Sequence, residues 1–207
     1  MLQVALDFSN LEDALRVADK VSGAGAHILE AGTPLIKSEG SRAISELKKR
    51  FPQTLVAADM KTMDAGQLEA EIAIKAGADI VAVLGVSSNT TIRDAVKFAK
   101  EHNKKTMVDL IGVKDKIKRA KEIELLGADY ILVHSGLDEQ VEGKTPFEDL
   151  KRVSSSVKVP MAVAGGINDK NISLLKEFKI DIVIVGGFIT KSKNPYDATK
   201  LILSSIR

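Results

Sequence analysis

The sequence predicts one α/β domain, a (β/α)8 or TIM barrel over residues 1–207, and three observations carry this prediction. Short apolar runs recur eight times, their starts are evenly spaced, and the segments between them have helical periodicity. Strands that alternate with helices in this way pair in parallel, and roughly 200 residues is the lower limit for eight such units. A doubly wound open sheet is the alternative, and the even spacing makes it the weaker one.

The expected strands share a high content of Val, Ile, Leu and Ala and follow one another at intervals of about 25 residues. They cover residues 2–7, 27–31, 55–61, 79–84, 105–110, 129–134, 159–164 and 181–186. Gly25, Gly77 and Gly127 each come two residues before an expected strand, which is typical of a left-handed cap at the end of a helix. No Pro-rich, Ser-rich or highly charged linker divides the chain.

The composition excludes several classes of protein. The hydrophobic content is 44% and charged residues make up 28%, as in a globular domain. The net charge of +2 is spread along the chain and aromatic residues are scarce, so we expect no nucleic-acid binding. The absence of Cys excludes disulfides and thiolate metal sites. Because neither a signal peptide nor a membrane-spanning run is found, we expect a cytoplasmic protein that does not bind membranes.

Polar residues and glycine pairs stand at the ends of most of the expected strands. In chain order they are Asp7, Glu30, Asp59, Lys61, Asp109, His134, Gly165-Gly166 and Gly186-Gly187. A single Asp at the end of a strand is commonly a turn former. Their repetition at equivalent positions instead indicates an active site, because the C-terminal ends of barrel strands carry the chemistry in this fold.

Asp59 and Lys61 are two residues apart in an otherwise apolar run, so strand alternation places both on one face. An ordinary core strand avoids such charges, because burying them is costly. Lys61 invites a Schiff-base interpretation, but the neighbouring Asp59 should raise the pKa of its amine. We therefore expect Lys61 to act as a fixed cation or proton donor.

Glu30 and Asp59 end neighbouring strands and could bring two carboxylates together. Such a pair either shares a proton or holds a divalent cation, and we favour Mg²⁺, which takes one or two carboxylates plus substrate oxygens and water. His134 ends a strand, where a neutral imidazole can move a proton at neutral pH. His27 and His102 lie at a strand start and near a helix end, and we expect them to be structural.

Three further segments leave alternatives open. Asp64 to Gln67 has the form of a capping box, which favours Asp64 as a helix cap. The two glycine pairs follow strands seven and eight, where many barrels bind phosphate, and Asn168-Asp169 could cap a short helix there. Residues 135–146 form the longest polar stretch, which is either a lid over the substrate or a solvated loop.

The segment from Ala58 to Gly66, with its Asp59-x-Lys61-x-x-Asp64 motif, resembles the signature of the orotidine 5′-phosphate decarboxylase suprafamily of barrels. Within it, the chain is similar to the 3-hexulose-6-phosphate synthases. The similarity covers nearly the whole chain. It continues through the segments 2–7, 30–37, 108–113, 134–138 and 163–167.

This resemblance implies a Mg²⁺-dependent, reversible aldol condensation of formaldehyde with D-ribulose 5-phosphate, through an enediolate, to give D-arabino-3-hexulose 6-phosphate. It implies a metal site at Glu30 and Asp59 and catalytic roles for His134, Lys61, Asp59 and Asp109. It also implies a homodimer with shared active sites, in which Asp64 reaches the partner subunit's site and is catalytic rather than a cap. Substrate contacts are expected from Asp7, Thr33, Gly165, Gly166, Gly186 and Gly187.

The related 3-keto-L-gulonate 6-phosphate decarboxylases are the enzymatic alternative. Where they carry Glu this chain has Asp109, and where they carry an Arg three residues after the His it has Leu137. Their phosphate-binding Arg after strand eight is also missing. These departures favour the synthase. A catalytically silent sugar-phosphate binding module is the non-enzymatic alternative, and it has little support because every expected carboxylate and the His are present.

Overall fold

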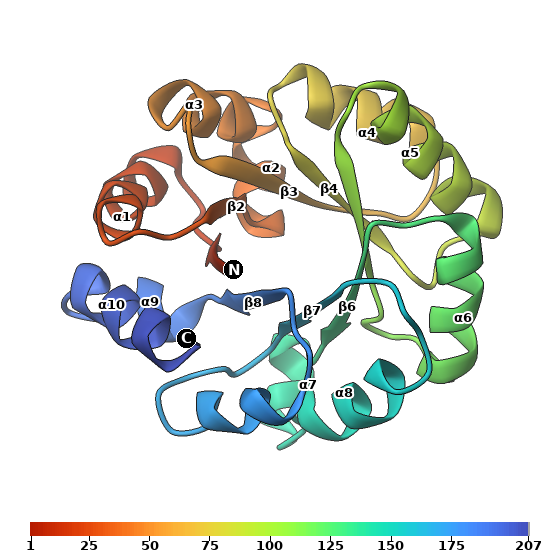
Figure 1. Ribbon diagram of the computed structural model, residues 1–207. Helices are drawn as coiled ribbons and strands as arrows, with labels where there is room; N and C mark the ends of the chain where they lie inside the picture. Colours follow the sequence, from red (N-terminus) through yellow and green to blue (C-terminus); the bar gives the residue numbers. More distant parts are fainter. Residues whose placement is uncertain (207) are drawn as a thin grey trace.

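The computed structural model describes residues 1–206, and these form a closed barrel of eight parallel strands in the order β1 to β8, with β8 paired to β1 (Figure 1). All eight expected strands are present, with ends within two residues of those predicted. They are β1 (Leu2–Leu6), β2 (Ile28–Ala31), β3 (Leu55–Thr62), β4 (Ile80–Leu84), β5 (Lys105–Asp109), β6 (Tyr130–His134), β7 (Met161–Ala164) and β8 (Ile182–Val185). The predicted (β/α)8 fold is confirmed.

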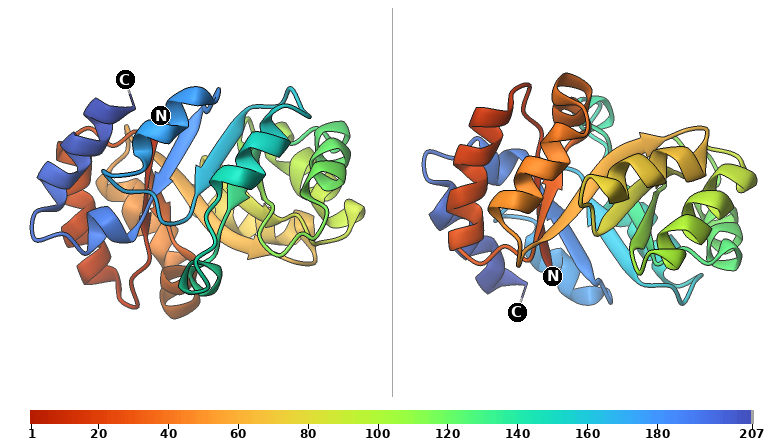
Figure 2. Two further views of the ribbon diagram at one scale, coloured as in Figure 1. Left: turned by 90° about the horizontal axis from the view of Figure 1, so that it is seen from below. Right: turned by 90° about the horizontal axis from the view of Figure 1, so that it is seen from above.

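Helices surround the barrel and bury its outer surface (Figure 1). They are α1 (Leu11–Gly23), α2 (Thr33–Glu39), α3 (Arg42–Arg50), α4 (Gly66–Lys75), α5 (Asn89–Glu101), α6 (Lys116–Leu126), α7 (Leu137–Val141), α8 (Phe147–Ser154), η1 (Ile172–Glu177), α9 (Gly187–Thr190) and α10 (Pro195–Ser205). The expected left-handed caps are confirmed, because Gly25, Gly77 and Gly127 all have positive φ. Two short helices, α2 and α7, project from the same end of the barrel (Figure 2).

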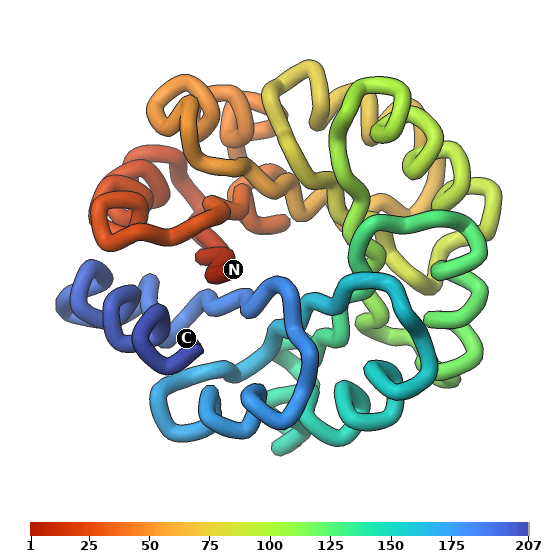
Figure 3. The backbone as a smooth tube through the Cα atoms, in the orientation of Figure 1, coloured from red at the N-terminus to blue at the C-terminus, as the bar shows by residue number. Residues whose placement is uncertain are grey.

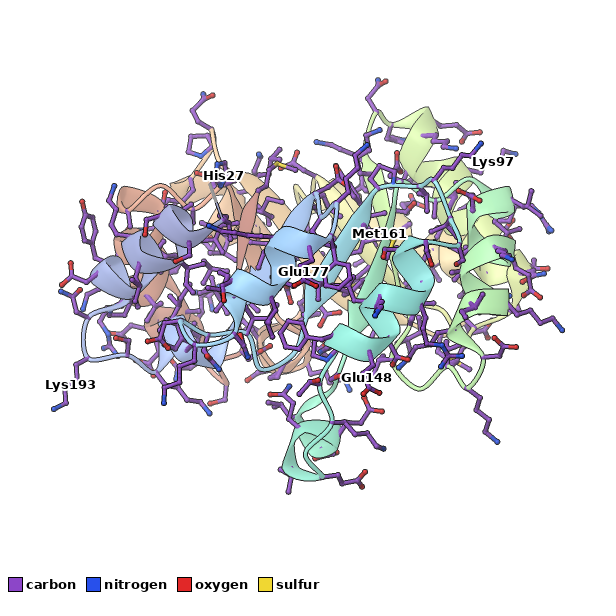
Figure 4. All side chains as sticks on the ribbon, turned by 60° about the horizontal axis from the view of Figure 1, so that its bottom comes forward. His27, Lys97, Glu148, Met161, Glu177 and Lys193 are labelled. Carbon is purple, nitrogen blue, oxygen red and sulfur yellow. The ribbon has the colours of Figure 1, made fainter. Side chains whose placement is uncertain are left out.

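The opposite end of the barrel is fastened by a repeated hydrogen bond. In four places the residue just before an even-numbered strand accepts a hydrogen bond from the backbone N–H of the first or second residue of the preceding odd-numbered strand. The bonds are Leu2 N to His27 Nδ1, Val56 N to Asp79 Oδ2, Thr106 N to Asp129 Oδ2 and Met161 N to Asp181 Oδ2, at 2.9 to 3.1 Å. His27 lies at the end remote from α7 (Figure 4), and its expected structural role agrees with this bond.

The inside of the barrel changes from bulky to small residues along the strands. Ile28, Ile80, Met107 and Ile182 belong to the inner core. Toward the C-terminal ends the inward residues include Ala5, Ala57, Ala82 and Ala164. Barrel interiors are usually filled by large branched side chains, so these alanines leave a hollow at the end where the polar residues gather.

The two ends of the chain close the ring. The Met1 amino group donates to the Asp181 carbonyl, and Val183 N donates to the Met1 carbonyl at 2.9 Å. The tube in Figure 3 shows β8 returning beside β1. Within residues 1–206, no helix has both the length and the apolar character that a membrane span requires.

Candidate active site

A cavity of about 810 Å³ opens at the C-terminal ends of the strands. All but one of the residues predicted for the site line it. They are Asp7, Glu30, Thr33, Asp59, Lys61, Asp109, His134, Gly165, Gly166, Gly186 and Gly187. The residue that does not line it is Asp64. His27 and His102 also lie outside, and His102 instead stacks on Phe98, with ring centroids 4.1 Å apart.

Asp59 and Lys61 point into the cavity because β3 is irregular at this point. The pairing with β4 passes from Ala58↔Val81 to Thr62↔Val83, so four residues of β3 advance against two of β4. Lys61 takes a left-handed φ of 46°, which non-glycine residues rarely adopt, and such strain is concentrated at functional sites. The predicted pair is confirmed, with Lys61 Nζ 2.8 Å from Asp59 Oδ2. This contact depends on the bulge in β3, and the regular alternation of side chains along a strand would not by itself produce it.

Lys61 is a cation held between two carboxylates. Its Nζ lies 2.8 Å from Asp59 Oδ2 and 3.5 Å from Asp109 Oδ2. Burial by itself lowers the pKa of Lys61, but the charges of Asp59 and Asp109 outweigh it and raise the pKa above its ordinary value. An amine with a raised pKa is a poor nucleophile, so the geometry agrees with the expectation of a fixed charge.

Asp109 orients His134. His134 Nδ1 lies 2.9 Å from Asp109 Oδ2, and Ile111 N donates to the other oxygen at 2.8 Å. Burial alone raises the pKa of Asp109, yet the hydrogen bond and charge of His134, with the charge of Lys61, hold it below its usual range. An ionised Asp109 accepts a hydrogen bond from Nδ1–H, which leaves Nε2 as the basic nitrogen of the ring.

Three carboxylates on neighbouring strands repel one another inside the cavity. Burial, followed by the charges of Asp59 and Asp7, raises the pKa of Glu30 well above its ordinary value. Enclosure by the surrounding residues, followed by the charge of Asp59, raises the pKa of Asp7, although its side chain opens to the cavity. Gly32 makes room for Asp7, because a Cβ there would collide with Asp7 Oδ1. Like charges in one pocket favour either protonation or a bound cation.

The free carboxylate oxygens in the cavity fit a divalent cation that the protein coordinates only in part. Glu30 uses Oε2 for its hydrogen bond with Gln3, and Asp59 uses Oδ2 for its bonds with Lys61 and Thr33. Their second oxygens, Glu30 Oε1 and Asp59 Oδ1, accept no hydrogen bond from residues 1–206. No three His, Asp or Glu side chains in that range are placed to hold a metal together. Mg²⁺ matches such a two-carboxylate site, because it keeps water and substrate oxygens as ligands.

The glycine pairs form the wall of the cavity beside β7 and β8. Gly165 has φ +108° and lies against the backbone of Ser135, where a Cβ would collide with the Ser135 carbonyl. The short helix α9 begins at Gly187. No helix begins at Asn168-Asp169, so that expectation is wrong. Instead the side chain of Asn168 donates to the Gly166 carbonyl at 3.0 Å, and the next helix is η1.

Asp64 is neither a helix cap nor one of the residues that line the cavity. The residue that precedes α4 is Ala65, in a left-handed conformation with φ 51°, and no side chain caps the helix. The capping interpretation is therefore wrong, because the turn after β3 places Asp64 one residue too early. Its side chain is exposed and forms no hydrogen bond with residues 1–206.

The polar stretch 135–146 contains a helix, α7, in addition to loop. Glu139 accepts from Gly136 N at 3.1 Å, and Gln140 Nε2 donates to the Ser135 carbonyl at 2.8 Å. Leu137 and Gln140 line the cavity, and the Leu137 side chain is largely exposed there. The segment stands at the cavity mouth, as a lid would, and its closure stays a prediction.

Sequence reasoning missed several residues that line the cavity. Gln3, Lys37 and Gln140 contribute polar side chains, and Lys191 lines the same cavity. One signal could have found Gln3, since Gln3, Ala5 and Asp7 alternate along β1 and share the inward face. Lys37 and Gln140 lie on short helices, whose approach to the cavity no strand pattern predicts.

A closed (β/α)8 barrel with acids, a lysine and an oriented histidine at the C-terminal ends of its strands belongs to the class of barrel enzymes. The family model described as "Orotidine 5'-phosphate decarboxylase / HUMPS family" matches residues 1–202. The chain belongs to this family. The predicted resemblance is thereby confirmed, and so is the prediction of an enzyme.

The relatives agree on the branch of the family. The 3-hexulose-6-phosphate synthase of Mycobacterium gastri is 44% identical over 99% of this chain and 99% of its own. A crystal structure of a 3-hexulose-6-phosphate synthase is 45% identical, with TM-score 0.95 over 100% of this chain and 99% of that chain. The 3-keto-L-gulonate-6-phosphate decarboxylase of Vibrio cholerae is 27% identical, with TM-score 0.87 over 100% and 96% of the two chains. The chain is thus more similar to these synthases than to that decarboxylase.

Proposed function

We propose that this protein condenses formaldehyde with D-ribulose 5-phosphate to form D-arabino-3-hexulose 6-phosphate, in a reversible aldol reaction. The observation that carries the proposal is the pairing of His134 with Asp109 beside the Glu30 and Asp59 carboxylates, in one cavity of a chain similar to the synthases. A ketose needs a base at C1 and positive charge at its oxygens to react in this way, and the cavity offers both.

Glu30 and Asp59 would hold Mg²⁺ through their open oxygens. The bound ion would supply a Lewis acid for the oxygens of the ketose. The residues of the chain prepare the site for it. Lys61 and Thr33 fix Asp59 Oδ2 at 2.8 and 2.7 Å, so the carboxylate cannot rotate freely. Burial and the charges of Asp59 and Asp7 raise the pKa of Glu30, and the bond from Gln3 and the charge of Lys61 offset this only in part, so a bound cation would find uncompensated negative charge there.

His134 moves the proton at C1. Its Nε2 removes a proton from C1 of ribulose 5-phosphate, and the electron pair left behind forms the enediolate. C1 then attacks the carbon of formaldehyde with the electron pair of the enediolate C1=C2 double bond. A new carbon–carbon bond forms, the C2 carbonyl is restored, and the formaldehyde C=O π bond breaks. The new alkoxide takes a proton either from water or from Lys61 Nζ, which then regains one from solvent, and the imidazolium of His134 releases its proton to solvent. Protons and electrons balance without any oxidant or reductant.

The phosphate of the sugar would lie against the glycine pairs. Gly165, Gly166 and Gly187 let the backbone approach a ligand closely, and N–H groups bind phosphate oxygens. Lys191 lines the same wall and forms no ion pair within residues 1–206, so its charge is available to the phosphate.

Two copies of the chain would share their active sites. Met63, Leu68 and Ile72 are large apolar residues that are 54%, 58% and 43% exposed, and Asp64 stands next to the first of them. A homodimer that buries this face would cover the apolar residues and carry Asp64 toward the partner subunit's cavity. This placement gives the exposed Asp64 a catalytic role that it lacks within its own subunit.

The test is consumption of formaldehyde by the purified protein with ribulose 5-phosphate and Mg²⁺. We expect consumption that depends on all three components and that Asp59→Asn abolishes while the circular dichroism spectrum is unchanged. The same protein should release little carbon dioxide from 3-keto-L-gulonate 6-phosphate. Faster decarboxylation than condensation would assign the chain to the alternative reaction, and binding of the sugar phosphate without turnover of either substrate would indicate a silent binding module.

A further inference from the structure

Gln3 is a polar side chain inside the barrel that the proposed reaction does not use. Its residue is 2% exposed, and the neighbours paired with it in the strand register are Ile28 on β2 and Ile184 on β8. Among residues 1–206, the buried polar or charged side chains that line the cavity are Gln3, Glu30 and Asp109. Glu30 and Asp109 already have proposed roles in the site, and Gln3 has none.

Within the described chain, the Gln3 side chain makes a single hydrogen bond. Its Nε2 donates to Glu30 Oε2 at 2.5 Å, and Oε1 is buried with no partner. A buried acceptor without a partner destabilises a fold, and a leucine of similar size would avoid this cost. Gln3 is therefore a poor choice for stability alone, and the bond to Glu30 is what the residue contributes.

The orientation of the amide follows from Glu30. Turning the Gln3 amide over would bring its carbonyl oxygen against the carboxylate oxygen, and two acceptors repel each other. With Nε2 toward Glu30, the bond fixes Oε2, and Oε1 is left without a hydrogen bond from residues 1–206. Ligating carboxylates in metal sites are themselves held by hydrogen bonds in this manner.

We propose that Gln3 is a positioning residue, which holds Glu30 Oε2 so that Oε1 is presented to the divalent cation. This inference rests on the proposed metal role of Glu30. It assigns to the first strand a function that neither the strand-end pattern nor the reaction scheme provides. Because Gln3 would act through Glu30, its effect should be confined to the binding of the cation.

The experiment compares the intact protein with its Gln3→Leu variant, using Mn²⁺ as the probe and the electron paramagnetic resonance signal of free Mn²⁺ as the readout. We expect the dissociation constant of Mn²⁺ to rise roughly 10- to 100-fold in Gln3→Leu. The Mg²⁺ concentration needed for half-maximal turnover should rise by the same factor, while kcat at saturating Mg²⁺ stays within about threefold. The thermal midpoint should be equal or higher, because the unpaired acceptor is gone.

Thr106→Val is the matched control, because Thr106 is also buried in a strand and loses a side-chain hydrogen bond at the opposite end of the barrel. It should leave Mn²⁺ binding unchanged. Mn²⁺ binding in Gln3→Leu within twofold of the unaltered protein would overturn the positioning role while leaving the metal site intact. Failure of the unaltered protein to bind Mn²⁺, with turnover unaffected by a chelator, would instead remove the metal role of Glu30 and this inference together.

Discussion

His134 Nδ1 lies 2.9 Å from Asp109 Oδ2, and the Asp109 side chain is only 1% exposed. The carboxylate is anchored in turn by Ile111 N, so the imidazole is held at the end of β6 by a group at the end of β5. This arrangement fixes which ring nitrogen is basic. It is the part of the site on which the proposed proton transfer depends most directly.

Replacing Asp109 by Asn should impair proton transfer more than substrate binding. The amide cannot hold the ring in a single tautomer, and an analogous change in a catalytic triad is very costly. We expect kcat to fall at least about 100-fold with a small change in KM. Exchange of the C1 proton of ribulose 5-phosphate in deuterated water, followed by NMR, measures this step. Asp129→Asn, at the other end of the barrel, should keep most of the exchange, and normal exchange in Asp109→Asn would contradict the role.

Lys61 should not form a covalent adduct with the sugar. The carboxylates of Asp59 and Asp109 raise its pKa and keep the amine protonated, and a protonated amine does not attack a carbonyl. Incubation with ribulose 5-phosphate and borohydride, followed by mass spectrometry, should therefore find Lys61 unmodified and activity retained. A reduced sugar adduct on Lys61 would show that burial lowers the pKa of its amine more than the two carboxylates raise it.

Asp64 and His134 should complement each other across two subunits. Asp64→Ala and His134→Ala homodimers should both be nearly inactive if each site takes Asp64 from the partner. A refolded equimolar mixture should regain about one quarter of the activity, since half of the dimers are mixed and each has one intact site. Refolding each variant alone is the control. No regain of activity in the mixture, with dimers present by light scattering, would place Asp64 outside the shared site.

Asp79 should stabilise the fold in a pH-dependent way. Burial by itself raises the pKa of Asp79, but bonds from Lys104, Lys48 and Val56 N outweigh it and lower the pKa below its ordinary value of 3.8. A depressed carboxyl pKa contributes stability above the unfolded pKa, and this contribution is lost as pH falls through the folded pKa. The stability difference between the protein and Asp79→Asn should be about 1 to 3 kcal/mol at pH 7.

The measurement is urea denaturation between pH 7 and pH 2.5. The difference from Asp79→Asn should be constant down to about pH 4 and then shrink as the carboxyl is protonated. Asp169→Asn is the control, because that exposed side chain makes no hydrogen bond within residues 1–206. A stability difference for Asp79→Asn that stays constant down to pH 2.5 would contradict the depressed pKa.

Much of the site could be predicted because a parallel barrel turns sequence position into spatial position. Glu30, Asp109 and His134 each end an apolar run, and the C-terminal ends of the strands meet at one end of the barrel. The glycine pairs were placed by the same rule. The predictions that were wrong concern the segments that connect strands to helices. The turn after β3 moved Asp64 out of the capping position, and η1 begins later than Asn168 suggested.

The sequence by itself determined the eightfold repeat, the set of polar residues at the strand ends and the family resemblance, because periodicity and motif spacing are local properties of the chain. The tertiary structure decided which of these residues act on one another. The partnership of Asp109 with His134, the bulge that turns Lys61 toward Asp59 and the bond from Gln3 to Glu30 each depend on strand register or backbone conformation. Contacts across strands, tens of residues apart in the chain, arise only when the barrel closes.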